Sequence, residues 1–303
     1  MTHDARPLAV LGAGTMGHGI AHAALTAGYH TRLYDVADVP LQKAVAVIRA
    51  IFARSVELGK DTAVNAEARL GFLSTTTSVA EAVGGAGVVI EAAPEKMDLK
   101  LTLLAEVQRH ALADAVIASN TSALSISEMA AMLDRPGRMG GMHFFNPVQK
   151  MKLVEVVRAL ETTDETVRTM IDVAVAMGKQ TVLVKESPGF ITSRINAMIG
   201  NEAFYLLQEG VASARDIDTA LKLGLNHPMG PFELVDLSGP RHAPEHPAVP
   251  APHARRKVPA VPAARRARCG RPARPQGGPR RVRLLRARLV RRRDAGTATA
   301  ARS

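Results

Sequence analysis

A glycine-rich turn that is followed by an acidic residue is the part of the chain whose spacing points most directly to chemistry. The apolar run Leu8–Leu11 leads into Gly12-Ala13-Gly14-Thr15-Met16-Gly17, and a second short apolar run ends at Asp35. In a strand–turn–helix unit, the first glycine permits the tight turn, the second lets the backbone approach a pyrophosphate, and the third allows close helix packing. The N–H groups at the helix start would bind the phosphates. The pattern predicts a dinucleotide site, and a βαβ unit without a ligand is the alternative.

The acid that ends the second apolar run indicates which dinucleotide binds. Asp35 follows the glycines at the spacing at which a carboxylate accepts hydrogen bonds from a ribose 2′-OH. Its negative charge would repel a 2′-phosphate. We therefore expect NAD rather than NADP as the cofactor.

Polar side chains in three other segments, two at strand ends and one within an apolar run, could carry out a reaction beside this site. The segments are Ser119-Asn120-Thr121-Ser122, His143-Phe144-Phe145-Asn146-Pro147 and Lys152-Leu153-Val154-Glu155-Val156. Ligands of open α/β sheets bind at the carboxyl edge of the strands, and an acid among apolar residues is costly to bury unless it is paired. We therefore predict a hydride transfer in which His143 takes the hydroxyl proton and Glu155 orients its ring.

Each of these residues also has a purely structural interpretation. Ser122 could cap the helix that follows it, His143 could be a hydrogen-bonded core histidine, and Glu155 could pair with a lysine. A metal site is not expected, because no spacing of His, Cys, Asp and Glu fits one.

The order of apolar runs and helix-like stretches predicts the fold class. Residues 7–35 are expected to form a strand, a helix and a strand. Further strands are expected within 71–78, 86–91, 115–119, 138–145, 154–157 and 181–184, and helices over 40–60, 97–111, about 127–133 and 163–177. This alternation predicts an α/β fold, a Rossmann-type doubly wound sheet that is mostly parallel.

The pattern changes after Pro188-Gly189, where strand-like runs end. Helices are expected over 190–209, from an N-cap at Ser213 to near Gly224, and from about 232 to 237. We therefore predict three parts: an NAD-binding Rossmann domain at 1–186, the start of a helical substrate and dimerisation domain at 187–239, and a tail at 240–303.

The charge of the chain is divided between these parts. Residues 1–239 contain 21 Lys and Arg and 26 Asp and Glu, whereas residues 240–303 contain 18 and 2. The single cysteine, Cys269, excludes an internal disulfide framework. No apolar run reaches the roughly 18 residues of a membrane span, and no secretory signal pattern opens the chain. We expect a cytoplasmic protein that does not associate with membranes.

Six motifs in this order resemble the 3-hydroxyacyl-CoA dehydrogenases, and among them the bacterial 3-hydroxybutyryl-CoA dehydrogenases. The resemblance runs from about residue 6 to Gly239. The motifs are the glycine-rich turn, the three polar segments above, Ser187-Pro188-Gly189-Phe190 and His227-Pro228-Met229-Gly230-Pro231. The resemblance implies oxidation of an (S)-3-hydroxyacyl-CoA at C3 with NAD, a reaction that the family also runs in reverse.

The resemblance also implies roles for individual residues. His143 would be the catalytic base, Glu155 its partner, and Ser122 would hydrogen-bond the substrate 3-oxygen as well as line the cofactor site. Glu95, Lys100 and Asn146 would line the nicotinamide end of that site.

One position departs from many relatives. Ser193 stands where they carry an Asn that holds the substrate, and a serine has a shorter reach. We expect Ser193 to bind substrate, with Asn196 assisting from about one helical turn further on.

After Gly239 the resemblance stops and the sequence becomes rich in Pro, Ala and Arg. A basic tail for nucleic acid or an anionic surface is one interpretation. A shifted reading frame is the other: 240–246 can be written in codons from which removal of one C gives Leu-Asp-Thr-Arg-Leu-Asn-Ile, and the shifted frame then reads like the family's C-terminus. First codon bases fit throughout, while the wobble bases are free. We therefore expect no specific nucleic-acid partner.

The shifted frame has functional consequences. The chain as written would lack helices of the second domain, most of the family's dimer interface and a lysine that in the family reaches toward the cofactor. We expect such a chain to fold its first domain and to have little or no activity. The open alternatives are a 3-hydroxyadipyl-CoA dehydrogenase and a non-catalytic nucleotide-binding remnant.

Overall fold

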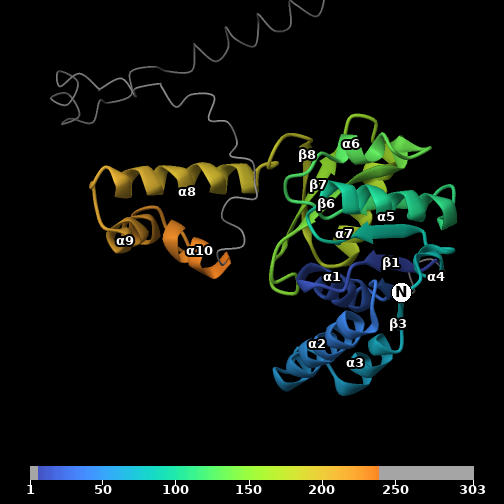
Figure 1. Ribbon diagram of the computed structural model, residues 1–303. Helices are drawn as coiled ribbons and strands as arrows, with labels where there is room; N and C mark the ends of the chain where they lie inside the picture. Colours follow the sequence, from blue (N-terminus) through green and yellow to red (C-terminus); the bar gives the residue numbers. More distant parts are fainter. Residues whose placement is uncertain (1–5, 239–303) are drawn as a thin grey trace, which may run out of the picture. The chain divides into compact units, whose positions relative to one another are not determined.

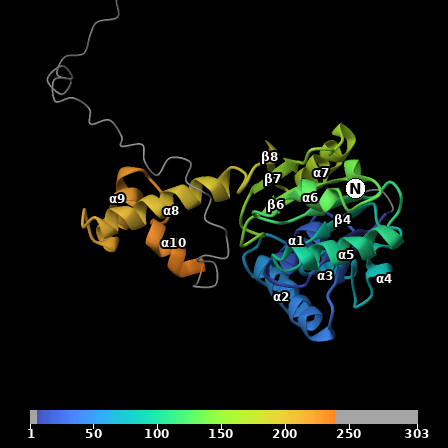
Figure 2. The same ribbon diagram turned by 45° about the horizontal axis from the view of Figure 1, so that its top comes forward.

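The computed structural model describes residues 6–238. A single sheet organises the part up to Lys185, and helices cover both of its faces (Figures 1 and 2). The strands are β1 (Leu8–Leu11), β2 (Thr31–Tyr34), β3 (Leu73–Thr76), β4 (Val88–Glu91), β5 (Val116–Ser119), β6 (Met139–Phe144), β7 (Leu153–Arg158) and β8 (Gln180–Lys185). The helices are α1 (Thr15–Thr26), α2 (Asp38–Glu57), α3 (Ala63–Leu70), α4 (Val79–Val83), α5 (Met97–His110), α6 (Ile126–Ala130), α7 (Asp164–Ala176), α8 (Thr192–Gln208), α9 (Ala214–Gly224) and α10 (Pro231–Ser238), with a 3₁₀ turn at Pro136–Arg138.

The strand order is β3-β2-β1-β4-β5-β6-β7-β8, so the chain reverses its direction of winding between β1 and β4. Strands β1 to β6 are parallel, β7 runs antiparallel to β6, and β8 is parallel to β7. This topology confirms the predicted doubly wound, mostly parallel sheet. It also brings the carboxyl ends of β1, β2, β4, β5 and β6 to one edge, where open sheets bind ligands.

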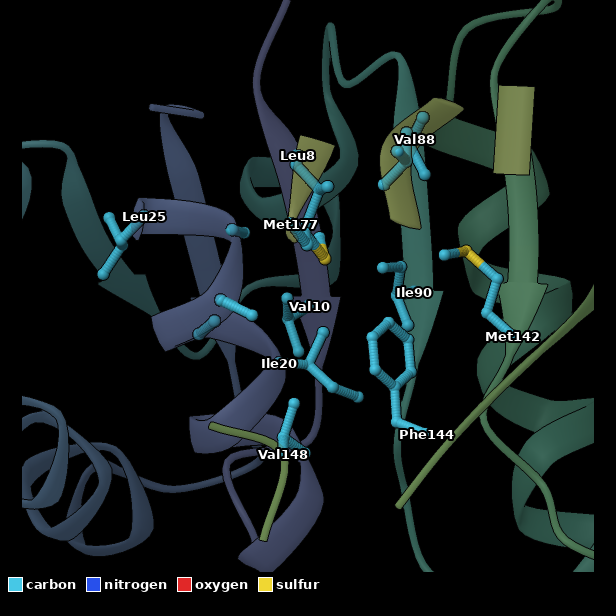
Figure 3. Close-up of a cluster of buried hydrophobic side chains, with 14 of the residues drawn as sticks. Leu8, Val10, Ile20, Leu25, Val88, Ile90, Met142, Phe144, Val148 and Met177 are labelled. Carbon is cyan, nitrogen blue, oxygen red and sulfur yellow. The ribbon is translucent and has the colours of Figure 1, made fainter. Parts of the chain in front are cut away.

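Two apolar cores hold the sheet, one on each face. Helices α1, α2 and α7 pack on one face, and α4, α5 and α6 pack on the other. Figure 3 shows part of the first core, in which strand and helix side chains interdigitate: Leu8, Val10, Ile20, Leu25, Val88, Ile90, Met142, Phe144, Val148 and Met177. Central strands that are buried on both faces are expected to be continuously apolar, as the LAVL of β1 is.

The structure contains two short α-helices, α3 and α4, that the sequence prediction missed. Each begins after a capping hydroxyl, of Thr62 or Ser78, which accepts a hydrogen bond from the N–H three residues on. Helix α6 begins at Ile126, one residue before the predicted start, because Ser125 caps it in the same way. Ser78 and Ser125 are each followed three positions later by Glu, a capping pattern that locates both helix starts.

Helices α8 to α10 follow the last strand. The predicted N-cap of α9 is confirmed, since the Ser213 hydroxyl accepts a hydrogen bond from the N–H of Asp216. The buried carboxylate of Asp218 accepts the N–H groups of Phe232 and Glu233 at the start of α10. A Cβ on Gly230 would lie 2.3 Å from this carboxylate, which explains the glycine between the two prolines of that turn.

The predicted division at 186/187 stays a prediction; it falls between the end of β8 and the start of α8. The predicted tail at 240–303 lies outside the described residues. No helix within 6–238 combines the length and the apolar character needed to cross a membrane.

Candidate active site

The glycine-rich turn lies where the winding of the sheet reverses. Gly12 follows β1 with φ +107°, and a Cβ there would lie 2.6 Å from the carbonyl oxygen of Ala92, which follows β4. A Cβ on Gly17 would lie 1.7 Å from the carbonyl oxygen of Gly12. Both positions therefore exclude a side chain: Gly12 because the loop after β4 lies against the turn, and Gly17 because helix α1 starts directly against it.

The start of α1 is open, as a phosphate-binding helix requires. Gly14 is its N-cap and provides no side-chain cap, and the first turn carries no acid. A Cβ on Gly14 would meet no atom within 4 Å. Because N–H groups and a positive dipole face this open space, the turn fits a pyrophosphate. Thr15 and Met16 lie in the same first turn.

Asp35 directly follows β2 and reaches the glycine-rich turn. One carboxylate oxygen accepts the N–H of Ala13 at 2.8 Å, and the other accepts the N–H of Val36 at 2.8 Å. Each oxygen can accept a further hydrogen bond. Asp35 thus has capacity for ribose hydroxyls. Burial, together with the charge of Asp35, raises the pKa of Tyr34 and keeps that neighbour neutral.

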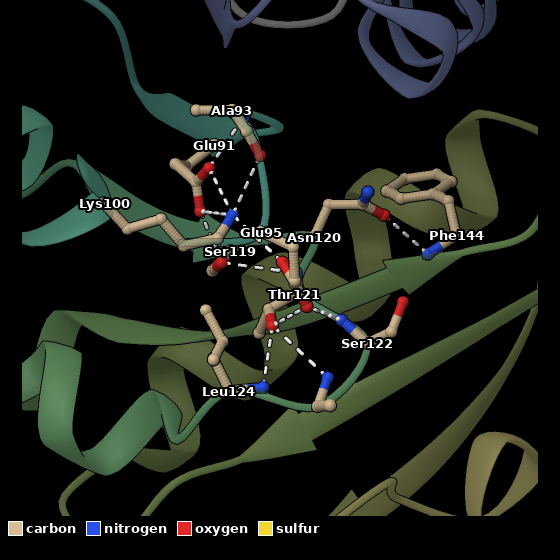
Figure 4. A network of polar contacts seen from close by, with 11 residues as sticks. Glu91, Ala93, Glu95, Lys100, Ser119, Asn120, Thr121, Ser122, Leu124 and Phe144 are labelled. Atoms are coloured by element: carbon tan, nitrogen blue, oxygen red, sulfur yellow. Dashed lines mark hydrogen bonds and ion pairs between the residues drawn. The ribbon is translucent and has the colours of Figure 1, made fainter. Parts of the chain in front are cut away.

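A buried ion pair lies behind the next two strand ends (Figure 4). The ammonium of Lys100 donates to the two carboxylate oxygens of Glu91 at 2.7 and 2.9 Å and to the carbonyl of Ala93 at 3.1 Å. The Ser119 hydroxyl donates to Glu91 at 2.5 Å. Glu91 and Lys100 are 0% and 1% exposed. Through these bonds Lys100 holds the loop after β4 against helix α5.

Glu95 connects this loop to the one after β5. Its carboxylate accepts the Thr121 hydroxyl at 2.5 Å and the N–H of Ser122 at 2.8 Å, and it lies 3.4 Å from the Lys100 ammonium. The Ser122 hydroxyl makes no contact in this network and points away from it (Figure 4). Ser122 does not cap α6, since that cap is Ser125.

The side chain of Asn120 joins the β5 loop to β6, because its carbonyl oxygen accepts the N–H of Phe144 at 2.9 Å. The residue before Phe144 is His143, which is 5% exposed and pairs in register with Glu155 on β7. Nδ1 of His143 lies 2.8 Å from a carboxylate oxygen of Glu155. The predicted acid–histidine pair is thus present in the geometry. Nε2 makes no hydrogen bond to any residue within 6–238.

Two further groups enclose this pair. The rings of Phe145 and Phe190 lie 4.6 and 5.7 Å from the His143 ring. At the start of α8, the backbone N–H and the hydroxyl of Thr192 both donate to the Glu155 carboxylate, at 3.0 and 3.2 Å. Three polar contacts, one from His143 and two from Thr192, therefore compensate the burial of the Glu155 carboxylate.

The loop after β6 lies over helix α1. Val148 contacts α1 so closely that a Cβ on Gly19 would lie 2.8 Å from its side chain. The ammonium of Lys179 donates to the carbonyls of Val148 and Met151, and burial lowers the pKa of Lys179. Exposed Asn146 follows the carboxyl end of β6 by two residues, at the same edge of the sheet as the glycine-rich turn.

For the remaining predicted residues, the described structure gives no contact that tests the predicted role. Ser193 is half-buried and Asn196 is exposed in the first turns of α8, three positions apart, and neither side chain has a hydrogen-bond partner within 6–238. Lys100 is directed at Glu91. Its predicted contact with the cofactor, and the roles of Ser193 and Asn196, stay predictions.

Sequence reasoning gave no role to three residues that organise the site, Glu91, Glu186 and Thr192, and it named Ser119 only as the first residue of a polar segment. Glu186 accepts the N–H groups of Ile126 and Ser127 and the hydroxyls of Ser125 and Ser127, and so fixes the start of α6. Glu91 ends an apolar run as Asp35 does, and that signal could have found it. Within the described residues no group of three or more His, Cys, Asp or Glu side chains could hold a metal ion.

A doubly wound sheet, an uncapped glycine-rich turn, an acid after β2 and a His–Glu pair at the same edge together define an NAD-dependent dehydrogenase. Residues 7–187 match the 3-hydroxyacyl-CoA dehydrogenase NAD-binding domain, and residues 189–247 match the C-terminal domain of the same enzymes. The chain belongs to the 3-hydroxyacyl-CoA dehydrogenase family, as the resemblance predicted. The second match extends beyond Gly239, where we placed the end of the resemblance.

Individual relatives agree with this assignment. A probable 3-hydroxybutyryl-CoA dehydrogenase of Bacillus subtilis is 41% identical over 236 residues, 78% of this chain and 82% of that protein. The 3-hydroxyadipyl-CoA dehydrogenase of Escherichia coli is 40% identical, over 79% of this chain and 50% of that protein. The crystal structure of (S)-3-hydroxybutyryl-CoA dehydrogenase from Ralstonia eutropha has a TM-score of 0.75 at 40% identity and covers 77% of this chain and 82% of its own.

Proposed function

We propose that this protein oxidises short-chain (S)-3-hydroxyacyl-CoA thioesters, 3-hydroxybutyryl-CoA among them, to 3-ketoacyl-CoA with NAD, and catalyses the reverse reaction. The observation that carries the proposal is the His143–Glu155 pair, in which Nδ1 is bound and Nε2 has no hydrogen-bond partner among residues 6–238. The named activities of the Bacillus and Ralstonia relatives support the substrate class.

The chain's own residues would handle the proton of this reaction. Oxidation removes a hydride from C3 and a proton from the C3 hydroxyl, and bound NAD⁺ supplies the hydride acceptor. Nε2 of His143 accepts the proton, and the imidazolium that results keeps its Nδ1–H donated to Glu155. Because the charged ring stays beside a buried carboxylate, the pair stabilises the charge that develops during the reaction.

Hydroxyl and amide groups around the pair would hold the reactants. The Ser122 hydroxyl has no partner in the polar network and would donate to the substrate 3-oxygen, while Glu95 fixes its backbone. Ser193 and Asn196 would contact the substrate. Glu95, Lys100, Ser122 and Asn146 would border the nicotinamide, and the residues from Gly12 to Gly17 together with Asp35 would hold the rest of NAD.

A second substrate, 3-hydroxyadipyl-CoA, is favoured by the similarity to the Escherichia coli enzyme of that name. The two substrates differ by a distal carboxylate, which needs a cationic or polar partner in the acyl pocket. The ratio of kcat/KM for the two thioesters decides between them.

We also propose that the frame shifts after Gly239 and that the complete protein is a homodimer through its second domain. A re-read of the DNA across the codons for Leu237 to Arg241 tests the shift directly. One spurious base supports it, and a confirmed read contradicts it.

The function itself is tested on two forms of the protein: the chain as written, and a frame-restored chain that lacks the extra base. NADH formation from (S)-3-hydroxybutyryl-CoA is followed in both. We expect turnover in the frame-restored chain and little or none in the chain as written. Absence of turnover with either thioester in a folded, NAD-binding, frame-restored chain contradicts the proposal, and full turnover by the chain as written contradicts the predicted loss of activity.

A further inference from the structure

The carboxylate of Glu155 accepts hydrogen bonds from Thr192 in addition to its contact with His143. It is 1% exposed and accepts three hydrogen bonds. Nδ1 of His143 lies 2.8 Å from Oε2, the backbone N–H of Thr192 donates to Oε1 at 3.0 Å, and the Thr192 hydroxyl donates to Oε2 at 3.2 Å. One residue outside the predicted site thus provides two of the three bonds.

The two bonds from Thr192 have different consequences. The N–H belongs to the first residue of α8, so a helix N-terminus with its positive dipole faces Oε1 and favours the charged carboxylate. This bond fixes the plane of the carboxylate and is retained whatever side chain stands at 192. The hydroxyl, in contrast, shares Oε2 with His143, and because a donor stabilises the charge on this oxygen it weakens the attraction of Oε2 for the other donor.

We propose that Thr192 is a positioning residue for the His143–Glu155 pair. Its backbone N–H fixes the orientation of the carboxylate, and its hydroxyl weakens the hydrogen bond between Oε2 and the Nδ1–H of His143. The assignment of His143 as the base rests on the proposed function, but the coupling of Thr192 to the pair does not. Removal of the hydroxyl leaves Oε2 to His143 alone. The protonated ring then becomes more stable.

Other charges on this face of the sheet are engaged with their own partners. Glu91 forms an ion pair with Lys100. Glu95 accepts a hydrogen bond from the loop after β5, and Glu186 accepts one from the start of α6. In the first turn of α8, Arg194 donates to the hydroxyl of Ser187. Glu155 is the only charged group within 6–238 that forms an ion pair with His143.

The test compares Thr192→Val, which removes the hydroxyl at nearly the same volume, with Thr192→Ser, which keeps it. Histidine-labelled full-length chain is titrated by NMR, and the His143 signal is assigned by its loss in His143→Gln. In Thr192→Val we expect the titration midpoint to rise by about half a pH unit, about threefold in the protonation equilibrium, since one hydrogen bond to a charged group is lost. Thr192→Ser should titrate as the parent does.

Two results overturn the proposal: the same or a lower midpoint in folded Thr192→Val, or an equal shift in Thr192→Ser. Should Thr192→Val fail to fold, Thr192→Ala replaces it with the same expected direction. In the frame-restored chain, the acid limb of the kcat/KM profile should move by the same amount. The NMR titration needs no turnover, so an inactive protein contradicts the proposed function and leaves the Thr192 result to be decided separately.

Discussion

Two buried acid–base pairs lie at the same edge of the sheet, and they differ in what remains available on the base. Glu91 pairs with Lys100 where β4 ends, and Glu155 pairs with His143 between β7 and β6. Both acids are at most 1% exposed. The Lys100 ammonium has a second acceptor in Ala93 and a second carboxylate nearby in Glu95. Within the part of the chain that the structure describes, His143 uses only one of its two nitrogens.

The contrast shows that burial and pairing alone do not distinguish a structural pair from a reactive one. A buried ammonium whose donors are all bonded holds backbone in place and has no lone pair to offer. A neutral imidazole keeps a lone pair on the second nitrogen when the first is bound to an acid. The two pairs should therefore respond to mutation in opposite ways, the first in stability and the second in turnover.

The largest effect is expected for His143→Gln in the frame-restored chain. Loss of a general base typically costs a factor of 10²–10⁴, so we expect kcat to fall by about 10³. The free energy of unfolding should fall by less than the barrier to turnover rises, because Glu155 keeps the two hydrogen bonds that Thr192 donates. Steady-state NADH formation and urea unfolding measure the two quantities.

The matched control for this substitution is His110→Gln, at an exposed histidine on α5 that is hydrogen-bonded to Glu106. It should leave both quantities as they are. If His143→Gln retains most of the turnover, His143 is not the base of the reaction, and the contrast drawn between the two pairs is wrong.

The second effect concerns Lys100→Met, which leaves Glu91 buried without a counter-charge. Removing one partner of a buried pair costs about 3–5 kcal/mol of the free energy of unfolding. The control is Arg54→Met, which breaks the exposed pair with Glu57 and should cost less than about 1 kcal/mol. Urea unfolding of the three chains checks this, and equal losses for both variants would contradict the structural role of Lys100.

The two pairs were not equally visible in the sequence. His143 stands in a motif at a strand end, and Glu155 is an acid among the apolar residues of the next strand, so the local sequence patterns predicted both residues and their pairing. The ion pair between Lys100 and Glu91 joins a helix to a strand end, and for Lys100 the family resemblance implied only a place beside the cofactor. Which neighbour satisfies a long side chain depends on tertiary packing that no local pattern specifies.

The strands and the topology of the sheet could be predicted from the sequence, but two short helices could not. Runs such as LAVL and VVIE identified buried parallel strands, and their alternation with helices predicted the topology. Helices α3 and α4 were missed because five to eight residues carry too little periodicity and their caps decide where they start. Thr192 was missed because its partner lies 37 residues away.

A third buried base, His22 on α1, forms no ion pair with an acid among the described residues. Its two nitrogens have no hydrogen-bond partner there either, and its ring lies 4.4 Å from that of Phe52. Burial, reinforced by the positive charge of Lys179, lowers the pKa of His22 to about 4. The folded protein therefore keeps this ring neutral, whereas the unfolded chain protonates it below its ordinary value of 6.5.

The smallest of the three effects follows from this difference. The free energy of unfolding should be complete above pH 7 and should decrease as the pH falls from 6.5 toward 4, by about 3 kcal/mol, since the unfolded chain binds the extra proton in that interval. His22→Leu should remove this component of the pH dependence, while His110→Leu should not. Urea unfolding of the parent and both variants across this range measures it. Parallel curves for the parent and His22→Leu would show that the ring is protonated in the fold, and that a buried base in this protein needs no acid to carry charge.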